Sequence, residues 1–120
     1  MSMQIETRLS DQLARYLDLA VSETKLTATN MANVDTPGYQ AQGFDFEAEM
    51  RNALGARDGQ SVAPIHEHPV DGLISRPDGN NVSVDREGLK LAEAQLKFKT
   101  GVALMRLENQ RVMDAIHADK

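Results

Sequence analysis

Few residues in this chain have the types and spacing that site chemistry requires, and the most suggestive cluster is His66-Glu67-His68. Histidines two residues apart lie on the same side of a β-strand, but not of a helix. A zinc site needs three or four protein ligands. No further histidine, cysteine or carboxylate follows at a convincing spacing, and His117 is distant in the sequence. An exposed loop is therefore the favoured interpretation, with a metal site as the alternative.

A second cluster, Asp78-Gly79-Asn80-Asn81, resembles the start of a calcium-binding loop. Such a loop closes with a glutamate at its twelfth position, which is Leu89 in this chain. Asp, Gly and Asn together are also typical of tight turns. The turn is the favoured interpretation.

The remaining composition excludes several classes of function. The chain has no cysteine, so it has neither a disulfide framework nor a thiolate ligand. It shows no Ser/His/Asp arrangement and no glycine-rich phosphate loop. The net charge of −5, without a basic arm, argues against binding to nucleic acid. We therefore expect no enzymatic activity, no cofactor and no metal.

Two long helices must supply the framework instead. From Ile5 to Met31 there is no Pro or Gly, and apolar residues recur at intervals of three and four. The cluster from Asn33 to Gly38 predicts the end of this helix, with Asn33 as a left-handed terminal residue. The predicted stripe consists of Leu9, Leu13, Leu17, Ala20, Thr24, Ala28 and Met31.

The second helix is predicted to begin with Asp85 as its N-cap. Its main stripe is a heptad-like seam of Leu91, Phe98, Val102, Met105, Asn109, Val112 and Ile116. A second stripe beside it consists of Leu89, Ala92, Leu96, Ala103 and Leu107. Asn109 is either a surface residue or a buried polar residue that fixes the register, and Gly101 either permits close helix approach or is neutral.

The middle of the chain contains all four Pro, six of the eight Gly and most of the net negative charge. This composition predicts loops, with a short strand at Phe44-Asp45-Phe46, two helical turns over 46–54 and a mobile segment over 55–80.

The predicted fold class is mainly α. Residues 1–33 and 85–120 form long helices packed as an α-hairpin or coiled coil, and residues 34–84 form a loop-rich middle with short extended segments. Apolar residues on two sides of both helices exceed what one hairpin can bury, so we expect helix–helix contacts with other subunits. No apolar run is long enough to span a bilayer, and no signal-peptide core is visible.

The first helix runs directly into Ala28-Thr29-Asn30-Met31-Ala32-Asn33-Val34-Asp35-Thr36-Pro37-Gly38-Tyr39. This stretch closely resembles the signature of bacterial flagellar rod and hook proteins, in which a helix leads into an Asn-x-x-Thr-Pro-Gly-Tyr turn. Asn30, Asn33, Thr36, Pro37, Gly38 and Tyr39 match it. Phe44-Asp45-Phe46, the stretch from Asp78 to Asp85 and the short middle are similar to one of the two short proximal rod subunits of that family.

The resemblance implies a structural subunit of the proximal rod of the flagellar basal body, in the periplasmic space. Such subunits leave the cytoplasm through the flagellar type III export apparatus without a cleaved signal peptide. The implied partners are copies of the chain, other rod proteins, the adaptor between membrane ring and rod, and the export gate. The terminal helices would surround the export channel. The alternatives are the other short proximal rod subunit and a cytoplasmic coiled-coil adaptor or chaperone.

Overall fold

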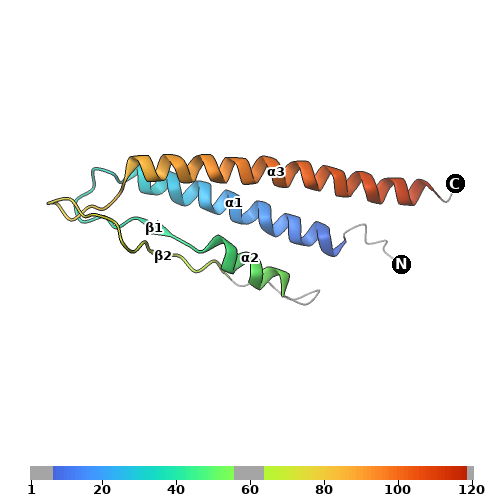
Figure 1. The fold of residues 1–120 in the computed structure, drawn as a ribbon, viewed down its shortest axis with the longest axis horizontal. Coiled ribbons are helices and arrows are strands. Elements are labelled where there is room, and N and C mark those ends of the chain that lie inside the picture. Colours follow the sequence, from blue (N-terminus) through green and yellow to red (C-terminus); the bar gives the residue numbers. More distant parts are fainter. Residues whose placement is uncertain (1–6, 56–63, 119–120) are drawn as a thin grey trace.

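The computed structural model describes residues 7–55 and 64–118, and these form an elongated antiparallel helical hairpin with a short arm along one side (Figure 1). The elements within these ranges are α1 (Arg8–Ala32), β1 (Gln42–Gly43), α2 (Phe46–Leu54), β2 (His68–Pro69) and α3 (Val84–His117). The molecule measures 69 × 25 × 19 Å. The prediction of a mainly α fold with long packed helices is confirmed. None of the helices in the described ranges is long and apolar enough to cross a membrane.

α1 begins and ends with side-chain caps. Thr7 accepts a hydrogen bond from the backbone N–H of Ser10, which satisfies one of the unpaired donors of the first turn. Asn33 ends the helix, as predicted, but its φ of −103° shows that the predicted left-handed conformation was wrong. In the turn that follows, Gly38 has a φ of +76°, a left-handed conformation that a residue without Cβ adopts at low cost.

The N-cap of α3 lies two residues earlier than predicted. Ser83 is the N-cap and accepts a hydrogen bond from the backbone N–H of Arg86, so the assignment of Asp85 as cap was wrong. Ser83 is the last residue with an extended backbone, and its hydroxyl can therefore reach the first turn. Asp85 and Glu87 lie in that turn, where the helix dipole favours negative charge.

The arm contains the two strands and α2. β1 pairs with β2 in antiparallel register, Gln42 opposite Pro69. The predicted strand at Phe44-Asp45-Phe46 was wrong, because Asp45 caps α2 by accepting from the backbone N–H of Ala48 and Phe46 already begins the helix. The predicted helical turns over 46–54 are confirmed. Residues 56–63 of the predicted mobile segment lie outside the described residues.

The face of α3 that packs on α1 is small in the middle and acidic at both ends. Glu87, Ala94, Gly101 and Glu108 are buried at seven-residue intervals, the repeat of a helix–helix seam. A Cβ atom on Gly101 would stand 2.7 Å from Leu17 Cδ2 and 3.0 Å from Tyr16 Cδ1. Of the two interpretations of Gly101, the structure therefore supports close helix approach.

Replacing Gly101 tests how tightly the helices pack. Gly101→Leu is expected to lower the free energy of unfolding by about 1–3 kcal/mol, because the new side chain overfills the seam. Gly88 is the matched control, since it lies in the same helix with no atom within 4 Å of its Cβ position. Gly88→Leu is expected to raise the free energy of unfolding by about 0.5–1 kcal/mol through helix propensity. Urea unfolding followed by circular dichroism measures both, and equal effects would contradict the close approach.

Candidate functional site

The two clusters with site chemistry form no metal centre in the described part of the chain. No group of three or more His, Cys, Asp or Glu side chains there is placed to hold an ion. His66 Nδ1 lies 2.9 Å from Glu49 Oε1, whereas His68 Nδ1 lies 3.0 Å from the Pro69 carbonyl oxygen. The two imidazoles thus have separate partners. The features that organise the chain are a polar turn, three charged or aromatic clusters and the helix faces.

The turn that follows α1 is built around Asn30, which is almost fully buried. Its side-chain nitrogen donates to the Gln42 carbonyl oxygen at 2.8 Å. Its side-chain oxygen accepts from the backbone N–H of Gln42 at 3.0 Å and from the Tyr39 hydroxyl at 3.1 Å. One amide therefore joins the last turn of α1 to the start of β1 and to the signature tyrosine. Burial raises the pKa of Tyr39, with a smaller contribution from the negative charge of Glu87.

Asn80 closes the same turn from the segment that precedes α3. Its fully buried amide donates to the carbonyl oxygens of Asn33 and Thr36, both at 2.8 Å. Its oxygen accepts from the backbone N–H of Val82 at 2.8 Å. The end of α1 is thereby held against the segment that leads into α3. The Asp78 carboxylate accepts from the Asn80 backbone N–H, which is the geometry of an Asx turn and agrees with the turn interpretation of this cluster.

Two glycines allow the two halves of the turn to touch. Gly38 donates its N–H to the Asp78 carbonyl oxygen at 2.9 Å. Gly79 has a φ of +87°, and a Cβ there would stand 3.3 Å from Gly38 Cα. The remaining signature residues lie on the surface: Thr36 donates to the Asn33 side chain, and Pro37 is exposed. The signature residues thus come together, and all of them lie at one end of the hairpin.

A buried carboxylate fastens the arm to α1. Glu49 of α2 is 4% exposed and accepts from the backbone N–H and the Nδ1 of His66, each at 2.9 Å. Arg15 of α1 lies 4.0 Å away. The hydrogen bond from the His66 backbone is the largest of the effects that lower the pKa of Glu49; the His66 ring and the Arg15 charge act in the same direction. This clamp joins α1, α2 and the segment before β2.

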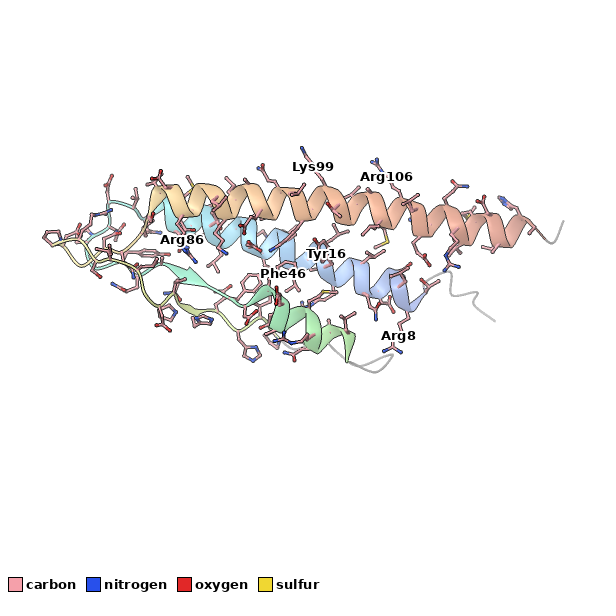
Figure 2. The ribbon with its side chains drawn as sticks, in the orientation of Figure 1. Arg8, Tyr16, Phe46, Arg86, Lys99 and Arg106 are labelled. Carbon is pink, nitrogen blue, oxygen red and sulfur yellow. The ribbon has the colours of Figure 1, made fainter. Side chains whose placement is uncertain are left out.

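The second cluster on the arm is aromatic. Figure 2 shows Tyr16 and Phe46 pointing toward one another from α1 and α2, with ring centroids 5.4 Å apart in an edge-to-face arrangement. Lys97 of α3 places its Nζ 3.9 Å above the Phe46 ring and also donates to Glu23 at 3.2 Å. Phe46 therefore contacts both long helices. The groove beside it, about 540 Å³ in volume, is lined mostly by charged and polar side chains.

A third cluster ties the start of α1 to α3. The Thr7 hydroxyl, which caps α1, donates to Glu108 Oε1 at 2.8 Å. Arg111 adds two hydrogen bonds to the same carboxylate, at 2.8 and 3.1 Å. The Arg111 hydrogen bond, followed by that of Thr7, lowers the pKa of Glu108. This carboxylate was missed by a search for apolar periodicity, although Glu87, Ala94, Gly101 and Glu108 repeat every seven residues.

The residues predicted for helix–helix assembly divide into three groups in the single chain. Leu13 and Ala20 are buried. Leu17, Met31, Leu91, Val102, Met105, Val112 and Ile116 are half-buried. Leu9, Phe98 and Asn109 are exposed. The exposure of Asn109 corresponds to its surface interpretation within one subunit.

Comparison with known proteins identifies relatives along most of the chain. The flagellar basal body rod protein FlgB of Salmonella typhimurium is 31% identical over 119 residues, covering 83% of this chain and 86% of the relative. FlgB of Cereibacter sphaeroides is 31% identical over 130 residues, covering 94% and 99%. The chain belongs to the FlgB family. FlgB of Escherichia coli is 26% identical over 121 residues, covering 85% of this chain. No protein-family model matches the chain.

Membership of the FlgB family makes the chain a structural rod subunit of the flagellar basal body, associated with other components of that structure. The prediction from the signature turn and the Asp78–Asp85 stretch is thereby confirmed. The alternatives, a rod subunit of the FlgC type and a cytoplasmic coiled-coil adaptor, are not favoured. In physical terms, the residues of the signature form the polar joint between the two long helices.

The hydrogen bonds of the Asn80 amide predict that its removal strongly lowers the stability of the fold. Asn80→Ala is expected to lower the free energy of unfolding by about 2 kcal/mol or more, because the buried N–H of Val82 loses its acceptor and the carbonyl oxygens of Asn33 and Thr36 each lose one of two donors. Asp35→Ala is the control, since Asp35 is an exposed side chain in the same turn. Its effect should stay within about 0.5 kcal/mol. Chemical denaturation measures both, and equal values would contradict the role of Asn80.

The contacts of Glu49 predict that the stability of the fold depends on pH. A lowered pKa in the folded state means that the carboxylate stabilises the fold above its unfolded pKa of about 4.3, and that this stabilisation is lost as the pH falls through the folded pKa. Glu49→Gln is therefore expected to be less stable than the wild type at pH 7, with a difference that narrows as the pH falls toward about 3. Urea midpoints across this range measure it. A difference independent of pH would contradict the ionic role of Glu49.

Proposed function

We propose that the chain is a non-enzymatic subunit of the proximal rod, in the periplasmic space. It is exported by the flagellar type III apparatus without a cleaved signal peptide and assembles through its terminal helices around the export channel. In this proposal residues 1–33 and 85–120 form the inner helical layer, and residues 34–84 lie outside it. The partners are copies of the chain, other rod proteins, the adaptor between membrane ring and rod, and the export gate.

The observation that carries the proposal is the apolar surface left on α3. Leu89, Leu96 and Leu107 are 62%, 67% and 67% exposed on the side of α3 away from α1. A run of large exposed apolar side chains along one helix marks an interaction surface. The buried positions of α3 are small or acidic, so these three leucines remain for contacts outside the subunit.

The signature turn has a supporting role in this proposal. The hydrogen bonds of Asn30 and Asn80 set where α1 ends and α3 begins. They therefore set which faces of the two helices point outward. The predicted assembly residues on α1 and α3 act through that arrangement, and the turn itself need not touch a partner.

Substitution of the α3 surface tests the proposal. Leu89→Asp combined with Leu107→Asp is expected to abolish swimming and remove the protein from purified basal bodies, while its circular dichroism stays that of the wild type. Both side chains are mostly exposed in the subunit, so the hairpin should tolerate the change. Gln95→Asp, an exposed position of the same helix, is the control and should swim normally. Normal swimming of the double variant would contradict assembly through this face.

A further inference from the structure

Two helix faces that take no part in the α1–α3 contact have the same spacing. The α1 outer face consists of exposed residues at alternating intervals of three and four: Asp11, Ala14, Asp18, Val21, Lys25 and Ala28. The α3 outer face has the same intervals: Leu89, Ala92, Leu96, Lys99, Ala103 and Arg106. This spacing gathers each set into one stripe along its helix.

The charges on the two faces are opposite and equally spaced. Asp11 and Asp18 are seven residues apart on α1, and Lys99 and Arg106 are seven residues apart on α3. Both intervals correspond to about 10.5 Å along a helix. Figure 2 shows Lys99 and Arg106 pointing away from α1, on the far side of α3. Within residues 7–55 and 64–118, these four side chains form no ion pair.

The hairpin also places these charges at matching positions along its long axis. Within one subunit, Thr7 contacts Glu108 and the backbone of Gly101 lies against Leu17. Counting along the two antiparallel helices from these contacts puts Arg106 level with Asp11, and Lys99 level with Asp18, to within one helical turn. A second subunit standing beside the first without axial shift would therefore bring each basic residue opposite an acidic one.

The apolar positions match in the same register. Leu96 lies level with Val21, and Leu89 with Ala28, so a large exposed side chain meets a smaller one in both places. Ala103 lies level with Ala14, where two small residues permit close approach. Lys25 lies level with Ala92, so no like charges oppose one another. The match in size and charge extends over about five helical turns.

We propose that the α3 outer face of one subunit packs on the α1 outer face of a second copy of this chain, with Lys99 beside Asp18 and Arg106 beside Asp11. The inference rests on the proposed assembly through the terminal helices and specifies its partner and register. The two faces differ, so the contact is head-to-tail. It leaves the α1 outer face of the first copy and the α3 outer face of the second copy available for further copies. Successive subunits then repeat the same contact with almost no shift along the helix axis.

Cysteine pairing tests the contact directly, because the chain has no cysteine of its own. Val21→Cys and epitope-tagged Leu96→Cys are co-expressed in the flagellated bacterium, and basal bodies are purified and mildly oxidised. Each chain then carries a single cysteine, so a disulfide between the two positions requires two copies. A disulfide-linked dimer of tagged and untagged chains, here called the mixed dimer, is expected. Val21→Cys with Gln95→Cys, one residue away on α3, is the matched control and should give much less mixed dimer.

Charge exchange tests the register. Lys99→Glu with Arg106→Glu is expected to reduce the yield of the mixed dimer at least about fivefold, the effect of about 1 kcal/mol. Asp11→Lys with Asp18→Lys should do the same. Combining all four substitutions should restore most of the parent yield, because the pairs are exchanged rather than removed.

The outcomes separate this inference from the proposed function. Incorporation of both cysteine variants into basal bodies without formation of the mixed dimer would overturn the contact and leave rod assembly intact. A disulfide to a different rod protein in place of the second copy would also overturn it. Failure of the chain with its native Val21 and Leu96 to co-purify with basal bodies would instead contradict the proposed function.

Discussion

The close approach of α1 and α3 at Gly101 is the constraint on which the rest of the structure depends. With only a hydrogen atom at this position, the side chains of Tyr16 and Leu17 can lie against the α3 backbone. Ala94, one heptad earlier, is also small and fully buried. The helices can therefore run side by side over most of α1, and Tyr16 is placed to receive Phe46 from the arm. A larger residue in this seam would separate the helices. It would displace the side chains packed on Gly101 and the contact between Tyr16 and Phe46.

Small residues permit the approach but do not determine the register, which polar groups set at the two ends of the seam. At one end, Glu108 binds Thr7, so the start of α1 is fixed along α3. At the other end, Asn80 holds the carbonyl oxygens that follow α1, and Asn30 joins α1 to β1. Buried polar groups with satisfied hydrogen bonds penalise alternative registers, because a shift leaves them unpaired in the interior. Register is thus defined by amides and a carboxylate rather than by leucines.

The sequence predicted the helices and the joint better than it predicted the seam. Helical periodicity and the cluster from Asn33 to Gly38 located both helices to within a few residues, because these signals are local. The cap at Ser83 was missed, since Asp85 is an equally good capping residue and only the path of the preceding turn distinguishes them. Of the α1-facing seam, only Gly101 was considered from the sequence, and the burial of Glu87, Ala94 and Glu108 was missed. The seam consists of small and acidic residues, and its burial depends on a distant helix that an apolar pattern cannot reveal.

The distribution of side chains on α3 has a consequence for stability. The four buried positions of α3 are small or acidic, whereas Leu89, Leu96 and Leu107 are mostly exposed, so the single subunit leaves large apolar side chains uncovered. Buried apolar area is the main favourable term in folding, so a hairpin with this arrangement gives up part of its own stability. When another helix covers these leucines, their apolar area is buried and the stabilisation is recovered. Their placement therefore links the stability of the hairpin to its assembly, and the polar joint must hold the two helices in register until a neighbour binds.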